Sequence, residues 1–297
     1  MSIAVVIPVY NRPKLILRAL ARVSDQSRLP DKLVVVDDGS TDDTGTVAER
    51  WLADNAGFPW QIVRTGNRGV AAARNAGATA TAGLNAIAFL DSDDEWPADF
   101  LAAAVAALER HPNALGAVAD RLTLMDGNQV HQAHAAEFTA DPVLWMLQHG
   151  AAMVTCSLFR RAAFDKIGGF DAAWRTGEDT RFFMALAPEG RLVPSRGMPV
   201  VVHCRPTASA DGDVASISMA SKKLFWTWAR QMEQLLAELP ADHRRAREAA
   251  IAETMAGRWG RTVWHMRQGN HRLLARHAQW RQFVWQKRHA RALAAAH

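Results

Sequence analysis

Short apolar runs alternate with polar loops and longer amphipathic segments over the first hundred residues. The apolar runs predict buried strands at Ile3–Val9, Leu33–Val36, Gln61–Arg64 and Ile87–Leu90, because each is short and ends in turn-forming or polar residues. Helical segments separate the strands, the first running from about residue 13 to residue 26. This alternation predicts an α/β fold with a parallel sheet whose helices cover both faces.

The fourth run is followed by a dense group of acidic residues. Residues 91–94 read Asp-Ser-Asp-Asp, and Pro97 suits the first turn of a following helix. The carboxyl ends of parallel strands meet at the edge of the sheet where ligands bind. Carboxylates this close repel one another unless a cation lies between them, and oxygen ligands suit Mg²⁺ or Mn²⁺, which would bind a diphosphate. The segment predicts a metal-nucleotide site, and its alternative is a solvated acidic turn near a helix start.

Four segments of this half carry motifs in a fixed order. They are VVIPVYNRP at 5–13, VVVDDGSTDDT at 34–44, NRGVAAARNAG at 67–77 and FLDSDDEW at 89–96. Together they resemble the successive motifs of glycosyltransferase family 2, inverting enzymes with the GT-A fold, over roughly residues 1–205. The resemblance implies a Rossmann-like, mostly parallel sheet and a nucleotide-diphosphate sugar as donor, with UDP as the expected nucleotide.

Donor-binding roles follow from the resemblance. In relatives the position of Asp91 usually touches ribose or sugar, and the position of Asp93 ligates the metal on the diphosphate. Asp38 stands where similar enzymes hydrogen-bond the uracil imide, and Arg74 is expected to reach the diphosphate. The other residues expected at the donor are Pro8 and Tyr10, which would frame the uracil ring, with Asn11, Arg12, Asn67, Gly69 and Ser92. The alternatives are a surface arginine for Arg74 and simple packing for Tyr10.

A catalytic base is expected in the second half of the chain, because the acceptor hydroxyl must lose its proton as it attacks the anomeric carbon. The sequences Gly-Gly-Phe-Asp at 168–171 and Gly-Glu-Asp at 177–179 resemble the GGFD and ED motifs of the family. The resemblance gives the base role to Asp179, with Glu178 as an orienting group or acceptor contact. A helix amino terminus also favours an ionised carboxylate. The alternative is that both acids only complement the helix dipole.

Two further segments carry possible roles. Residues 200–205 read VVVHCR, and His203 is expected to complete the metal shell unless it is a structural histidine at a strand end. The segment 206–221, which contains Ser216 and Ser218, is either a mobile loop that closes over the donor or a plain linker.

Length and composition limit the organisation. A chain of 297 residues, 49% hydrophobic, can bury one large core with an appendage. We expect a GT-A catalytic domain at 1–218, with nucleotide-sugar binding in 1–96 and the acceptor side and base in 97–218, followed by a helical extension at 219–297. Two cysteines make no disulfide framework, and no Cys/His spacing resembles a zinc site. No basic leader precedes the first strand and no apolar run could cross a bilayer, so we expect a cytoplasmic protein, with peripheral contact at the inner face of the membrane as a further option.

The expected extension differs in charge from the rest of the chain. Residues 222–297 hold 15 Lys and Arg against 5 Asp and Glu, and six of the eleven tryptophans. Apolar periodicity predicts helices at about 219–238, 243–267 and 271–294. Three interpretations stay open: packing on the catalytic domain or in a homodimer, contact with an anionic membrane or a lipid-linked acceptor, and binding of an acidic polymer or peptide. Nucleic acid is not expected, since nothing else in the sequence supports it.

The sequence as a whole predicts an inverting, metal-dependent glycosyltransferase of bacterial polysaccharide or glycoconjugate biosynthesis. The acceptor would be a hydroxyl of a glycan, a lipid-linked sugar or another molecule, and the stretch 120–160 has no spacing that identifies it. A nucleotidyltransferase is the alternative enzyme. The sequence has no Gly-rich phosphate loop with a following lysine near the first strand, which counts against this alternative. A sugar-nucleotide-binding module without activity is the rival outside enzymes.

Overall fold

The predicted mixed α/β architecture is confirmed in the computed structural model, which describes residues 1–125, 127–150, 152–204, 224–269 and 271–295. A seven-stranded sheet has the order β3-β2-β1-β4-β8-β5-β9. Its strands are β1 (Ile3–Val9), β2 (Lys32–Asp37), β3 (Trp60–Arg64), β4 (Ala86–Phe89), β5 (Gly116–Val118), β8 (Ser157–Arg160) and β9 (Leu192–Pro194). The first four are parallel, β8 runs antiparallel to both β4 and β5, and β9 is parallel to β5.

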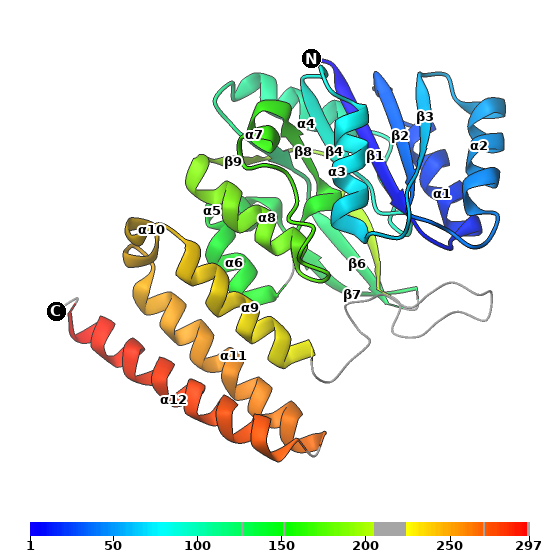
Figure 1. The fold of residues 1–297 in the computed structure, drawn as a ribbon. Coiled ribbons are helices and arrows are strands. Elements are labelled where there is room, and N and C mark those ends of the chain that lie inside the picture. Colours follow the sequence, from blue (N-terminus) through cyan, green and yellow to red (C-terminus); the bar gives the residue numbers. More distant parts are fainter. Residues whose placement is uncertain (126, 151, 205–223, 270, 296–297) are drawn as a thin grey trace.

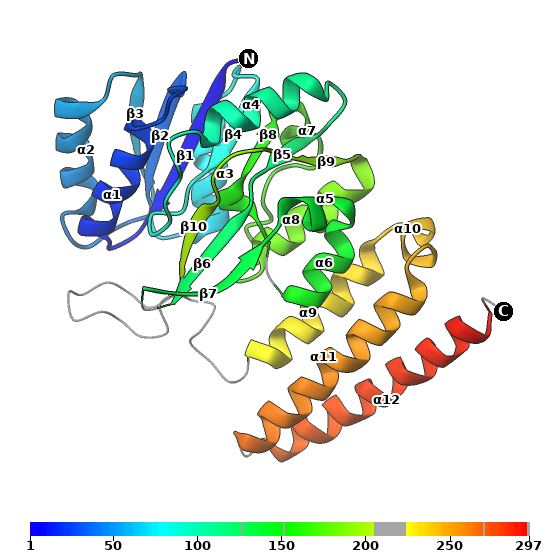
Figure 2. The same ribbon diagram turned by 180° about the vertical axis from the view of Figure 1, so that it is seen from behind.

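Helices cover both faces of this sheet. They are α1 (Pro13–Ser24), α2 (Thr44–Asn55), α3 (Val70–Ala80), α4 (Phe100–Arg110), α5 (Ala135–Ala140), α6 (Pro142–His149), α7 (Arg161–Lys166) and α8 (Glu178–Leu186), with 3₁₀ turns at Val154–Cys156 and Ala187–Glu189. Figures 1 and 2 show α3 in front of the sheet and α1 and α4 behind it. Because β1 is buried along its whole length between these layers, its sequence is a continuous apolar run.

The close approach of α3 to the sheet fixes the position of its first turns. Val6 of β1 lies opposite Val34 of β2 and Phe89 of β4. A Cβ atom added at Gly77 of α3 would collide with the side chain of Val6. The absence of a side chain at residue 77 therefore lets α3 rest on the strand and holds its amino-terminal half, including Arg74, at the edge of the sheet.

A second, three-stranded sheet is attached to the acidic loop after β4. It consists of β6 (Arg121–Met125), β7 (Asn128–Ala133) and β10 (Val200–Cys204), in the order β10-β6-β7. Glu95 and Val201 exchange two backbone hydrogen bonds of 2.9 and 3.0 Å. The small sheet is thereby tied directly to the loop that carries Asp91 and Asp93.

The carboxyl-terminal part is helical, as predicted, and lies beside α6 and α8 (Figure 1). Its helices are α9 (Leu224–Glu238), α10 (Ala241–Arg245), α11 (Glu248–Gln268) and α12 (Arg272–Ala294). The helix expected at 243–267 is divided, because α10 ends at Arg245 and α11 begins at Glu248. The first residues of the helix expected from 219 lie outside the described residues. Within those residues, none of the helices combines the length and the apolar character needed to cross a membrane.

One largely buried carboxylate joins three of these helices. Glu233 of α9 accepts hydrogen bonds from the indole nitrogens of Trp259 (2.8 Å) on α11 and Trp285 (2.5 Å) on α12. It also pairs with Arg281 of α12. Because the side chain of Glu233 is only 12% exposed, these partners offset the cost of burying its charge.

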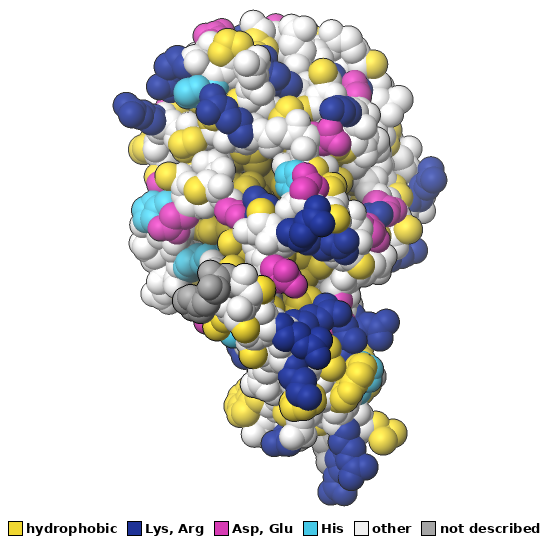
Figure 3. All heavy atoms as spheres, turned by 90° about the vertical axis from the view of Figure 1, so that its left-hand side faces the viewer, with side chains coloured by type: hydrophobic (Ala, Val, Ile, Leu, Met, Phe, Trp, Pro, Cys, Tyr) yellow, Lys and Arg dark blue, Asp and Glu magenta, His cyan; other side chains and the backbone are white. Residues whose placement is uncertain are grey.

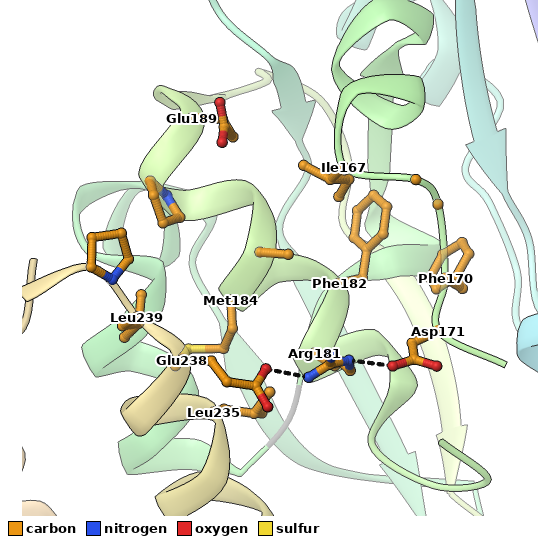
Figure 4. A pocket seen from close by; sticks show the side chains of 15 residues that line it. Ile167, Phe170, Asp171, Arg181, Phe182, Met184, Glu189, Leu235, Glu238 and Leu239 are labelled. Carbon is orange, nitrogen blue, oxygen red and sulfur yellow. Dashed lines mark hydrogen bonds and ion pairs between the residues drawn. The ribbon is translucent and has the colours of Figure 1, made fainter. Parts of the chain in front are cut away.

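The extension is fastened to α6 and α8 by polar contacts. The buried guanidinium of Arg258, on α11, donates to the carbonyl of Leu147 at the end of α6. Arg247, in the break between α10 and α11, donates to Asp141, which caps α6. Arg181 of α8 pairs with Asp171 at 2.7 Å and with Glu238 of α9 at 2.5 Å, beside a pocket of about 520 Å³ (Figure 4).

Candidate active site

An ion-pair network surrounds the buried side chain of Arg74 at the carboxyl edge of the sheet. One guanidinium nitrogen lies 2.7 Å from Asp91 Oδ1, after β4, and the other lies 2.9 Å from Glu178 Oε1, at the start of α8. The side chain of Arg74 is 4% exposed and its guanidinium also lies over the ring of Phe170. Burial acts to lower the pKa of Arg74, but the negative charges of Asp91, Glu178 and Asp179 outweigh it and raise that pKa.

The two acids at the start of α8 differ in their partners. Glu178 is held by Arg74, whereas Asp179 accepts a 2.7 Å hydrogen bond from the backbone N–H of Thr180 and forms no ion pair within the described residues. Burial, with repulsion from Asp179, raises the pKa of Glu178 to about 7. Burial also raises the pKa of Asp179. A carboxylate shifted in this direction can take up a proton near neutral pH.

Asp93 is paired with an arginine from the first loop. Its Oδ2 lies 2.9 Å from Arg12, which also donates to the hydroxyl of Ser92 at 3.3 Å, and its backbone carbonyl accepts from Arg18 at 2.7 Å. The described residues hold no group of three or more His, Cys, Asp or Glu side chains that could bind a metal ion. Mg²⁺ commonly uses one or two carboxylates and completes its shell with water and substrate phosphates, so the oxygen donors of Asp91 and Asp93 fit such an ion. The metal at Asp93 stays a prediction.

His203 contacts the two acidic residues that follow Asp93. Its Nε2 is 2.9 Å from Glu95 Oε1, and its backbone N–H donates to Asp94 Oδ1 at 3.1 Å. Glu95 also pairs with Arg22 at 2.8 Å and Arg18 at 3.4 Å. Although burial acts to raise the pKa of Glu95, hydrogen bonds from Arg22 and His203 lower it. Metal ligation by His203 is untested.

The Glu95 cluster is a feature that the sequence analysis missed. Arg18 and Arg22 are four residues apart and therefore lie on one face of α1, which was the available signal. Their acidic partner comes from a loop more than seventy residues away. The cluster connects α1, the acidic loop and β10, and so supports the loop that carries Asp91 and Asp93.

Asp38 organises the loop before α3. Its carboxylate is buried and accepts three hydrogen bonds, from the Thr65 hydroxyl (2.6 Å) and from the backbone N–H groups of Arg68 (2.8 Å) and Gly69 (2.7 Å). A carboxylate has about four lone-pair sites, so one is left for a base N–H. Recognition of uracil by Asp38 stays a prediction beside this structural role.

The other residues predicted at the donor lie in, or next to, the same group of loops. Asn11 and Asn67 both adopt the left-handed backbone conformation, with φ of 50° and 47°, which asparagine tolerates better than most residues. Asn11 exchanges hydrogen bonds with Thr41 after β2. Tyr10 is 37% exposed, and Pro8 is buried within β1. Ser216 and Ser218 lie outside the described residues.

The sequence matches a known family model. The model described as glycosyl transferase family 2 matches residues 4–168. An uncharacterized glycosyltransferase of Nostoc sp. is 31% identical over 201 residues, which cover 65% of this chain and 61% of that protein. The match thus spans less than two thirds of this relative.

Solved structures share the fold at low sequence identity. Staphylococcus aureus TarS 1–349, in complex with UDP-GlcNAc, aligns with a TM-score of 0.66 and 18% identity over 96% of this chain and 89% of that chain. The mannosyltransferase PcManGT of Pyrobaculum calidifontis, in complex with GDP-Man and Mn²⁺, aligns with a TM-score of 0.58 and 20% identity over 99% of this chain and 85% of that chain. These alignments bear out the predicted GT-A fold. Since the family model covers more than half of the sequence, including Arg74, Asp91 and Asp93, the chain belongs to glycosyl transferase family 2.

Proposed function

We propose that the protein is an inverting, metal-dependent glycosyltransferase that moves a sugar from a UDP-sugar to an acceptor hydroxyl by a single displacement. The observation that carries the proposal is the position of Arg74 between Asp91 and Glu178. This one buried cation connects the acidic loop expected to hold the donor with the helix expected to hold the base. The complex of TarS with UDP-GlcNAc supports UDP as the nucleotide.

The donor would lie across the loops after β1, β2, β3 and β4. Asp91 would contact ribose or sugar, Asp38 the uracil N–H, and Arg74 the diphosphate, with Pro8 and Tyr10 beside the base. The other donor contacts would come from Asn11, Arg12, Asn67, Gly69 and Ser92. Mn²⁺ or Mg²⁺ on Asp93 would supply Lewis-acid stabilisation of the negative charge on the diphosphate, and the Mn²⁺ in the PcManGT complex supports such an ion.

Asp179 would act as the general base. As the acceptor oxygen bonds to the anomeric carbon, its proton passes to the Asp179 carboxylate, and the bond from that carbon to the diphosphate breaks. Glu178 is less suited to this step because Arg74 already holds its carboxylate. The raised pKa of Asp179 brings its basicity closer to neutral pH than that of an ordinary aspartate.

The proposal is tested by donor binding and turnover in the wild type, Asp93→Ala and Asp179→Asn. UDP-, GDP- and dTDP-sugars are compared by thermal shift with and without Mn²⁺, and UDP release is followed without added acceptor and with a panel of glycan and lipid-linked acceptors. We expect a Mn²⁺-dependent shift with UDP-sugars that Asp93→Ala abolishes and Asp179→Asn retains. Asp179→Asn should bind donor but release UDP at least about a hundredfold more slowly.

Asp171→Asn is the matched control for the base. Asp171 is an aspartate of the same region, but it pairs with Arg181 beside the pocket of Figure 4. Its replacement should leave UDP release near the wild-type rate. Release of pyrophosphate would instead identify a nucleotidyltransferase, and donor binding without any turnover would identify an inactive binding module.

A further inference from the structure

Helix α12 has one buried face and one exposed face. The residues that it buries are Ala275, Ala278 and Trp285. On the other side Leu273, Trp280 and Phe283 keep 81%, 55% and 52% of their surface exposed. Large apolar side chains exposed on one element mark an interaction surface more often than those scattered singly over a protein.

Basic residues share this exposed face. α12 contains six Lys and Arg and no Asp or Glu. Arg276 lies three residues after Leu273 and four before Trp280, and Lys287 and Arg291 lie seven and eleven residues after Trp280. These spacings place side chains on the same side of a helix. The ammonium of Lys287 lies 4.7 Å from the centre of the Phe283 ring. Leu273, Arg276, Trp280, Phe283, Lys287 and Arg291 together form the surface that we call the outer face of α12.

The bases of the outer face have no acidic partner in the described part of the chain. None of Arg276, Lys287 and Arg291 appears in an ion pair there, and the exposed acids of α11, Glu248 and Glu253, pair with none of them. In Figures 1 and 2, α12 is the outermost helix, separated from the sheet by α9 and α11. Figure 3 shows groups of Lys and Arg side chains among hydrophobic ones on this lower part of the molecule.

Charge decides between the partners that could cover this face. A second copy joined by the same face would bring positive charges against one another, because a two-fold interface places identical surfaces together. Nucleic acid would neutralise Arg276, Lys287 and Arg291 but would leave Leu273 exposed. A bilayer that contains anionic lipids satisfies both kinds of side chain, since its headgroups attract the bases and its interface accepts Trp, Phe and Leu.

We propose that the outer face of α12 binds the surface of a membrane that contains anionic lipids. The helix would lie along the surface, with Leu273, Trp280 and Phe283 at the boundary between headgroups and acyl chains. The long stems of Arg276, Lys287 and Arg291 would let their charges reach the phosphates. This binding requires neither donor nor acceptor, so it is independent of the sugar-transfer reaction.

The test is sedimentation of the full-length protein with vesicles of equal parts phosphatidylglycerol and phosphatidylcholine, compared with pure phosphatidylcholine. We expect binding to the anionic vesicles that is lost at about 1 M salt, where charges are screened within about 3 Å. Arg276→Gln, Lys287→Gln and Arg291→Gln combined should lower partitioning about a hundredfold, since each base contributes about fivefold. Leu273→Ser, Trp280→Ser and Phe283→Ser combined should lower it by at least about tenfold.

The matched control removes three exposed arginines elsewhere, Arg50, Arg110 and Arg196, by replacement with Gln, and should retain vesicle binding. Unchanged melting temperatures establish that all variants are folded. The proposal is overturned if the intact protein ignores anionic vesicles, if the control loses binding as much as the α12 variants, or if light scattering shows a dimer that the α12 changes dissociate. The proposal is also overturned if the apolar substitutions leave binding to the anionic vesicles unchanged. Binding would then depend on charge alone, and charge alone would attract nucleic acid equally well.

Discussion

Asn75 and Phe170 are joined by two hydrogen bonds that connect the two halves of the site. The side-chain amide of Asn75, on α3, donates to the carbonyl of Phe170 at 2.7 Å, and the N–H of Phe170 donates to the Asn75 carbonyl oxygen at 2.9 Å. Phe170 is buried and its ring also lies under the guanidinium of Arg74. Asn75 therefore fixes the loop at 168–171 to the same helix that carries Arg74.

Asn75→Ala should destabilise the protein by about 2–4 kcal/mol, because it leaves a buried N–H and a buried C=O without partners. The melting temperature should fall by about 5–10 °C. Asn75→Asp keeps the acceptor but sets a carboxylate oxygen against the Phe170 carbonyl, so it should be at least as destabilised as Asn75→Ala. Equal melting temperatures for all three proteins would show that the loop does not depend on this pair.

Arg74→Lys tests whether residue 74 acts through the geometry of its guanidinium group or only through its positive charge. An ammonium group cannot donate in the fork geometry that reaches Asp91 and Glu178 together. UDP release should fall about a hundredfold, as expected when reacting groups are misplaced by about 1 Å. Arg161→Lys is the matched control, because Arg161 is another arginine that pairs with an acid, Asp165. This variant should release UDP at the wild-type rate. A fully active Arg74→Lys enzyme would mean that positive charge alone is sufficient.

The pH profile should reflect the raised pKa values of Glu178 and Asp179. A carboxylate base with a raised pKa is protonated below that value, so turnover should rise with pH through a limb that lies above the usual carboxylate range. Glu178→Gln should move this limb to lower pH, because a negative charge that opposes ionisation of Asp179 is removed. The measurement is UDP release across pH. A limb near 4 in the wild type would contradict the prediction.

Arg12→Gln should make the enzyme easier to saturate with Mn²⁺. Arg12 lies 2.9 Å from Asp93 and would compete with the ion for this carboxylate. An ion pair that is this little exposed contributes about 1 kcal/mol. The Mn²⁺ concentration that gives half of the UDP-dependent thermal shift should therefore be about fivefold lower in Arg12→Gln. Arg22→Gln, which removes a partner of Glu95, is the control. A higher Mn²⁺ requirement would instead show that Arg12 supports diphosphate binding.

The order of the first four strands and three helices could be predicted because each depends on a local pattern, the short buried run or the helical period. The Arg74–Glu178 contact joins residues 104 positions apart. The resemblance to a family assigned Arg74 to the diphosphate and Glu178 to the neighbourhood of the base, but it did not predict that the two side chains touch. Asp171 belongs to a motif of that family, yet the motif does not indicate its ion pair with Arg181 of α8, which depends on the fold. The apolar periodicity did not predict the division between α10 and α11. Arg247 lies in this division and donates to Asp141, which is far away in the sequence.

The junction at Glu233 gives the molecule a built-in optical probe. Six of the eleven indoles belong to residues 222–297, and those of Trp259 and Trp285 report on the same carboxylate. Fluorescence during denaturation should therefore follow separation of α9, α11 and α12 more closely than loss of the sheet, whose strands contain one tryptophan, Trp60, among the described residues. Circular dichroism and fluorescence recorded on one sample would then show whether the helical extension melts with the half that contains the seven-stranded sheet or before it.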